Sequence, residues 1–205
     1  MLTNAAYAAP SALELELAKN LAGTTHVFLH RDSIDGALYS CGLEFGTVTQ
    51  DFTTQQGGIT KLAGSFYLRK RKEGSPIYLL KLGLFDGLKA VAVAPANAFI
   101  RPEFGKAPVK ALGTPGEKAG FTLFGGQIDD DVGAILRSIV VDRKVVIGFN
   151  RRPGQKDAIS FIDLTVQETS FDGVKPVRIH SEKMVQDFSR CVDDLLSSPT
   201  ETTNK

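Results

Sequence analysis

The chain has 205 residues, of which 42% are hydrophobic and 23% charged, and 24 lysines and arginines nearly balance 23 aspartates and glutamates. These values are ordinary for a globular protein, and a net charge near zero gives no electrostatic signature of nucleic-acid binding. No apolar run approaches the roughly 20 residues that span a bilayer, so neither a nucleic-acid partner nor a membrane span is expected.

The first ten residues are rich in alanine and predict either a signal-peptide remnant or a flexible arm. Ala6 and Ala8 have the small-x-small spacing of a signal-peptidase site, with cleavage expected just before Ala9. The basic and apolar regions of a complete signal peptide are missing. Residues 1–10 therefore favour a periplasmic or secreted protein, with a cytoplasmic one as the alternative.

The next hundred residues predict a helix followed by antiparallel strands. Ser11 and Glu14 form a capping box in front of a helix over 12–22. Stretches rich in β-branched and aromatic residues follow, separated by turn residues. Alternating alanine and valine at 90–94 favour a central position for the last of these strands. The predicted strands are 24–30, 37–45, 59–69, 77–85 and 88–100.

Residues 101–120 contain three prolines and four glycines and predict a long loop. The loop lies within a single β-rich domain, 11–196, or joins two halves of it, 11–100 and 121–196.

The stretch 121–166 predicts a strand, a helix and a hairpin. Apolar residues at helical spacing follow Asp129, Asp130 and Asp131, whose carboxylates suit a helix N-terminus. A calcium loop would need more alternating oxygen ligands than three adjacent aspartates provide. Gly133 within the helix is expected where another element packs closely. Pro153 and the glycine after it predict the hairpin turn.

Basic residues gather at the tip of this hairpin, between the strands 144–149 and 158–166. Arg151, Arg152 and Lys156 are candidate contacts for an acidic partner, with a solvated turn as the alternative.

The chain ends with a predicted strand over 174–180, a helix beginning near Ser181 and a disordered tail, 197–205. The two cysteines are Cys41, in a predicted strand, and Cys191, on or beside the apolar face of the last helix. In an exported protein they are expected to form a disulfide. In a cytosolic protein they would be buried thiols. The N-terminal pattern favours the disulfide.

These elements predict an α+β fold that is mainly β, with antiparallel, sandwich-like sheets and N-terminal, central and C-terminal helices. His26, His30 and Asp32 are the candidate site of an enzyme, but two histidines four residues apart on a strand are separated by about 13 Å, too far to share a metal. Neither a nucleophile elbow nor a phosphate-binding glycine loop is present. No cofactor or metal is therefore expected.

Between 121 and 191 the chain runs in the order strand, helix, strand, polar turn, strand ending in Asp-Leu, and helix with Phe-x-x-Cys. The segments are 121–124, 131–140, 144–149, 159–164 and 188–191. This order resembles small exported proteobacterial proteins of the invasion-associated locus B type, and type VI secretion accessory proteins with a similar ending. The resemblance implies a β-rich domain, a late cysteine paired with an earlier one, and no catalytic residues.

We therefore predict a non-enzymatic exported protein that binds a protein partner, as an envelope or secretion accessory factor. Its expected surfaces are the 151–156 tip and the 101–120 loop. The alternative is a small hydrolase or metal-dependent enzyme with a site near His26, His30 and Asp32.

Overall fold

The computed structural model describes residues 9–71, 75–87, 89–106, 113–173 and 175–197. Most of the predicted N-terminal arm and tail, and part of the predicted 101–120 loop, lie outside these ranges. In the described chain no helix is long and apolar enough to cross a membrane.

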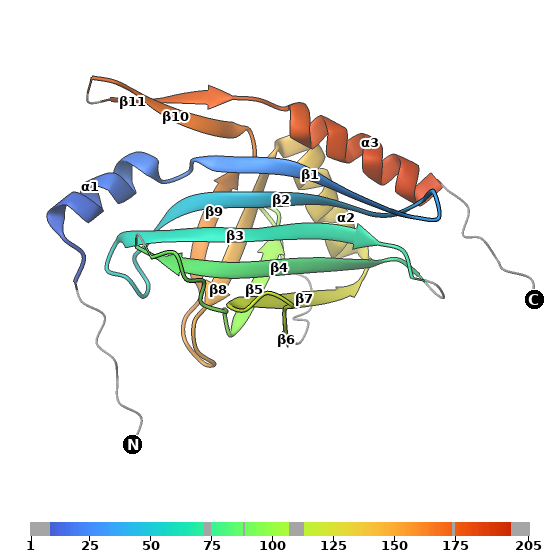
Figure 1. The fold of residues 1–205 in the computed structure, drawn as a ribbon, viewed down its shortest axis with the longest axis horizontal. Helices are drawn as coiled ribbons and strands as arrows, with labels where there is room; N and C mark the ends of the chain where they lie inside the picture. Colours follow the sequence, from blue (N-terminus) through green and yellow to red (C-terminus); the bar gives the residue numbers. More distant parts are fainter. Residues whose placement is uncertain (1–8, 72–74, 88, 107–112, 174, 198–205) are drawn as a thin grey trace, which may run out of the picture.

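The larger sheet, sheet A, is antiparallel throughout and has the strand order β1-β2-β3-β4-β7-β6. In Figure 1 its strands run across the front of the molecule. The strands are β1 (Thr25–Ile34), β2 (Ala37–Asp51), β3 (Gly58–Arg69), β4 (Ile77–Asp86), β6 (Thr114–Pro115) and β7 (Phe121–Gln127).

A smaller antiparallel sheet, sheet B, lies behind sheet A in this view, and its strands run across those of sheet A (Figure 1). It contains β5 (Asn97–Arg101), β8 (Lys144–Asn150) and β9 (Ala158–Asp163), in the order β5-β8-β9. A separate hairpin, β10 (Val166–Asp172) and β11 (Lys175–His180), lies beside β1. Apolar side chains of both sheets and of the second and third helices form one buried core.

Strands cross the boundary between the two halves considered above. β7, from the later part of the chain, pairs with β4, and β5, from the earlier part, pairs with β8. Each half therefore supplies a strand to the other half's sheet.

Three helices complete the fold: α1 (Ala12–Leu21), α2 (Asp130–Arg137) and α3 (Lys183–Ser197). The Ser11 hydroxyl accepts the Glu14 N–H at 3.2 Å, and the Asp129 carboxylate accepts the Val132 N–H at 3.0 Å. α2 continues into a π-helical turn, Ser138–Asp142. The predicted fold class, α+β and mainly β with helices at these three places, is confirmed.

The two cysteines join α3 to β2 of sheet A. Cys41 of β2 and Cys191 of α3 have their sulfurs 2.01 Å apart and their Cα atoms 5.9 Å apart. α3 packs against β1 and β2, and both cysteines are buried in the core. The disulfide closes a loop with a sequence separation of 150 residues.

Two local predictions are wrong. The stretch 88–100 is not a central strand: in its described part, from 89 onward, the only strand pairing outside β5 is a bridge between Val93 and Leu84, and Val91 is exposed. Its alanines bury little area, and Pro95 lacks the N–H that a central strand donates. Gly133 has open space around it, because no atom lies within 4 Å of where a Cβ would stand.

Candidate functional site

The outer face of sheet A points away from sheet B and toward the viewer in Figure 1. Two neighbouring cavities hollow this face. Successive side chains of a strand point to opposite faces, so the register places outer-face residues in rows across the strands. One row contains small residues over three strands, Gly46, Ala63 and Gly83, with His26 at one end and Phe121 at the other. Gly46 and Ala63 of this row form the floor of a depression, and Gly83 lies under the Phe121 ring at its edge.

Two aromatic rings lie flat on this face because glycines leave room for them. A Cβ on Gly42 would stand 2.2 Å from the Tyr67 ring, and a Cβ on Gly83 would stand 2.8 Å from the Phe121 ring. Each ring therefore covers a glycine of the neighbouring strand. Between the rings the surface falls to Ala63 and Ser65.

The depression is a cavity of about 420 Å³, called the larger cavity below. Lys61, Lys81 and Lys118 reach it from β3, β4 and the loop before β7, and in the described part of the chain none of the three forms an ion pair. Lys81 Nζ is 5.4 Å and Lys118 Nζ is 5.3 Å from the centroid of the Phe121 ring. The lining thus combines unpaired cations with an aromatic surface.

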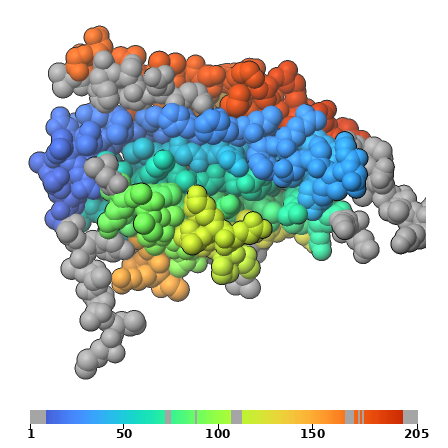
Figure 2. Space-filling model, viewed as in Figure 1, coloured from blue at the N-terminus to red at the C-terminus, as the bar shows by residue number. Residues whose placement is uncertain are grey.

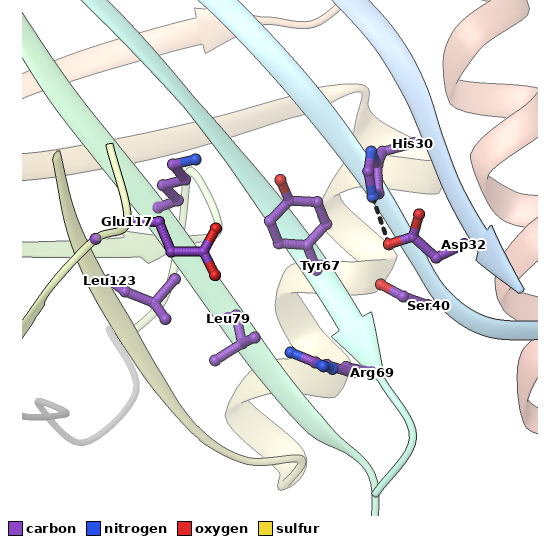
Figure 3. Close-up of a pocket in the computed structure, with 10 residues that line it drawn as sticks. His30, Asp32, Ser40, Tyr67, Arg69, Leu79, Glu117 and Leu123 are labelled. Carbon is purple, nitrogen blue, oxygen red and sulfur yellow. Dashed lines mark hydrogen bonds and ion pairs between the residues drawn. The ribbon is translucent and has the colours of Figure 1, made fainter. Parts of the chain in front are cut away.

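A second cavity of about 280 Å³, the smaller cavity, adjoins the first and shares Tyr67 and Lys81 with it. Figure 3 shows its lining, with Glu117 and Leu123 on one side of Tyr67 and the β1–β2 residues on the other. The loop before β7, in yellow in Figure 2, lies against the front of sheet A. The lining residues are His30, Asp32, Ser40, Tyr67, Arg69, Leu79, Lys81, Gly116, Glu117 and Leu123.

His30 is held between two carboxylates. Its Nε2 is 2.8 Å from an Asp32 oxygen and its Nδ1 is 3.4 Å from a Glu44 oxygen, while the Tyr67 ring meets it edge-on at 5.1 Å between centroids. Burial raises the pKa of the Tyr67 hydroxyl, and the Glu44 and Asp32 charges raise it further, against the opposing effect of Ser65. Tyr67 therefore stays neutral at physiological pH and offers a hydroxyl to either cavity.

The structure brings together part of the predicted enzyme site. His30 and Asp32 are in contact in the smaller cavity, whereas His26 lines the larger cavity on the same face. Ser40 also lines the smaller cavity, but both imidazole nitrogens of His30 already face carboxylates. A serine nucleophile that relies on a histidine base needs a free ring nitrogen, and this arrangement leaves none for Ser40. Among the described residues no three His, Cys, Asp or Glu side chains are grouped to hold a metal ion.

The predicted partner-binding tip is only partly at the surface. Arg152 and Lys156 are exposed, whereas the Arg151 side chain is only 3% exposed, so the surface of the tip presents Arg152 and Lys156 rather than Arg151. Its guanidinium turns inward to Asp51 at 2.6 Å and Asp86 at 2.5 Å, at the ends of β2 and β4. It also donates to the hydroxyls of Thr54 and Thr60.

This cluster, the Arg151 cluster, is a structural link between the β8–β9 hairpin and sheet A. Burial favours the neutral form of each ionisable group, but the opposite charges outweigh it. The pKa of Arg151 is raised despite its burial, because Asp86 and Asp51 stabilise the cation. The pKa of Asp51 is lowered despite its burial, because Thr54 and Arg151 donate hydrogen bonds to the carboxylate. The charges are therefore retained and paired.

Comparisons with protein-family models, with curated proteins and with solved structures found no match to this chain. The resemblance described above thus stays a prediction, and the case for function rests on the geometry of the outer face.

Sequence reasoning missed the outer-face site because its floor depends on register. Gly46, Ala63 and Gly83 are far apart along the chain, and only strand pairing places them in one row. An available signal was the repeated placement of glycine within strands, which often marks a close approach of another group.

Proposed function

We propose that this protein is an exported, non-enzymatic binding protein that holds a ligand on the outer face of sheet A. The observation that carries the proposal is the hollow itself, in which unpaired lysines surround flat aromatic rings on a floor of small residues. Ligand sites are concave and largely apolar, with a few placed polar groups. The larger cavity has this composition, and its volume lies within the usual range of roughly 300–1,000 Å³.

The disulfide supports export. Disulfides form and persist in oxidising compartments such as the periplasm, and the bond between Cys41 and Cys191 lies in the core, where it links sheet A to α3. The resemblance to exported accessory proteins extends the proposal to an envelope or secretion role with a protein partner. Arg152 and Lys156 at the hairpin tip remain the predicted contacts for that partner.

Backbone amide spectra test the binding site. A library of small neutral, anionic and cationic compounds is added to ¹⁵N-labelled protein purified from an oxidising compartment. We expect the shift changes to gather on outer-face residues of β2, β3, β4 and β7. Shifts scattered over the surface, or gathered at sheet B, would overturn the proposal. A thiol count and the mass of the mature N-terminus, from the same sample, test export.

The enzyme alternative is supported by one observation, the contact of His30 with Asp32 in a cavity that Ser40 also lines. p-Nitrophenyl acetate is a suitable probe, because a serine hydrolase releases its chromophore. Hydrolysis that disappears in His30→Ala and persists in Lys118→Gln would favour the enzyme over the binding protein, because Lys118 lines the larger cavity but not the smaller one. We expect no hydrolysis above that of free imidazole in either variant or in the unaltered protein.

A further inference from the structure

We propose that the larger cavity binds an anionic amphiphile, a small molecule that carries one acidic head group on an apolar body. This inference rests on the proposed function, because it assigns a ligand class to the same face. It goes further in stating which end of the ligand meets which residues. Three features of the lining carry it: its charge balance, its aromatic surface and its contrast with the smaller cavity.

The charge balance favours an anion. The lining contains three lysines, Lys61, Lys81 and Lys118, against one glutamate, Glu44, and three minus one leaves an excess of two positive charges with His26 neutral. Glu44 faces His30 rather than a lysine. Cations that have no acidic partner on the protein and surround a concave site attract an anion and concentrate it there.

The position of two ammonium groups locates the head group. Lys81 and Lys118 come from a strand and from a loop, yet both lie between 5 and 6 Å from the centre of the Phe121 ring, at 5.4 and 5.3 Å. An acidic head placed beside this ring would meet two donors at once. Charge-assisted hydrogen bonds of this kind are about twice as strong as neutral ones.

The aromatic surface favours an apolar body. Phe28 of β1 lines the larger cavity and is 62% exposed. Other parts of β1 contact α3 and β10. The floor between Phe28 and Phe121 includes Gly46 and Ala63, whose side chains carry no hydrogen-bonding group. Covering this area removes apolar surface from water, which stabilises the complex.

The smaller cavity has a different charge balance. Arg69 and Lys81 there face Asp32 and Glu117, so two cations meet two anions. Arg69 is also engaged by Tyr39, whose hydroxyl accepts from Nε at 2.8 Å and whose ring lies 4.7 Å below the guanidinium. An anion therefore gains more in the larger cavity, and the body of the ligand is expected there rather than across Tyr67.

A series of ligands with one tail and three head groups tests the ligand class. Decanoate, decanol and decyltrimethylammonium are titrated below their micellar concentrations, and displacement of the anionic dye 1-anilinonaphthalene-8-sulfonate is followed by fluorescence. We expect decanoate to bind at least tenfold more tightly than the cation, with decanol between them. Raising the salt from 50 to 500 mM is expected to weaken decanoate and leave decanol unchanged.

Matched variants assign the binding to the larger cavity. Lys81→Gln and Lys118→Gln are each expected to weaken decanoate about fivefold to tenfold, the usual effect of losing one favourable charge contact of about 1 kcal/mol, and to leave decanol unchanged. Lys19→Gln, which removes an exposed charge on α1, is the control and is expected to change neither. Phe28→Ser is expected to weaken both decanoate and decanol.

The outcomes separate this inference from the proposed function. Equal affinity for the three head groups, or tighter binding of decyltrimethylammonium, would overturn the assignment of an anionic amphiphile. The proposed function would stand if the amide spectra still showed ligands on the outer face. Binding of decanoate that Lys81→Gln and Lys118→Gln leave unchanged would also overturn it. Amide shifts absent from the outer face would overturn the proposed function as well.

Discussion

The basic side chains at the two faces of sheet A differ in whether they have acidic partners. At one end of the inner face Arg151 is buried and donates to two carboxylates, Asp51 and Asp86. On the outer face Lys61 and Lys81 stand beside a hollow and form no ion pair with the described residues. A buried charge is tolerated only when it is paired and hydrogen-bonded, whereas an exposed one keeps its water until a ligand replaces it.

This difference separates scaffold from site. Side chains that hold the two sheets and α3 together have their partners within the chain, and removing one leaves a buried group without its partner. Side chains of the hollow have no such dependence, so their loss is expected to change binding and leave stability nearly unaltered. Measurements of the free energy of unfolding of variants on both faces test this difference.

The largest expected effect is the loss of the disulfide on the inner face. Replacing both cysteines, Cys41→Ala with Cys191→Ala, removes a cross-link across a separation of 150 residues. Loop-closure entropy predicts a loss of about 5 kcal/mol in the free energy of unfolding. Urea unfolding of the variant and of the oxidised protein measures it. A loss under about 1 kcal/mol would mean that α3 is held on sheet A by packing alone.

The next effect is expected at the Arg151 cluster. Arg151→Ala leaves Asp51 and Asp86 buried without their cation, which costs about 3–5 kcal/mol. Arg152→Ala, one residue along and exposed, is the matched control and is expected to stay within about 0.5 kcal/mol. Urea unfolding of the two variants side by side gives the comparison. Similar losses in both would contradict the assignment of Arg151 to the scaffold.

The sequence could predict what depends on neighbours along the chain. Capping by Ser11 and Asp129 follows from residues three positions apart, and both hydrogen bonds are present. The β-rich class follows from local alternation. The burial of Arg151 depends instead on Asp51 and Asp86, which lie 100 and 65 residues away. A basic residue in a hairpin turn is usually solvated, and nothing local distinguishes Arg151 from Arg152.

The hollow of the outer face was hidden from sequence reasoning for a related reason. Gly83 is ordinary within its own strand and makes room for a ring at the edge of the hollow only through its pairing with Phe121. Register is a property of the assembled sheet. Local patterns therefore predicted elements and caps, and failed where side chains from distant strands meet.

A smaller, pH-dependent effect is expected at Asp51. Its pKa is lowered in the folded protein, because the bonds from Thr54 and Arg151 outweigh burial. The stability it contributes is therefore present above the unfolded pKa of about 3.9 and is lost as the pH falls through the lowered folded value. Asp51→Asn is expected to cost about 2–3 kcal/mol at neutral pH.

Unfolding free energies of the protein and of Asp51→Asn, measured from pH 7 to pH 2.5, test this sign. The difference in unfolding free energy between the protein and the variant is expected to hold steady down to about pH 4 and then to shrink. Below that pH the Asp51 carboxylate takes up a proton and becomes neutral, as the asparagine amide is at every pH. A constant difference through the acid range would contradict the lowered pKa.

The smallest expected effects come from adding one methyl group at two glycines. In Gly83→Ala the new carbon would stand 2.8 Å from the Phe121 ring, so the ring must move. The expected cost is about 1–3 kcal/mol, and decanoate binding falls with the displaced ring. In Gly133→Ala the carbon meets no atom within 4 Å, and the better helix propensity of alanine is expected to add about 1 kcal/mol.

These two variants test whether the Phe121 ring has one fixed position at the edge of the hollow. The Phe121 ring is the group that a methyl on Gly83 would meet, so the methyl would be harmless if Phe121 had no fixed place there. A loss at Gly83 beside a gain at Gly133 would show that the ring is held in one position at the edge of the larger cavity. Equal small changes at both sites would mean that Phe121 moves freely, and the lysines beside it would then not define one position for an acidic head group.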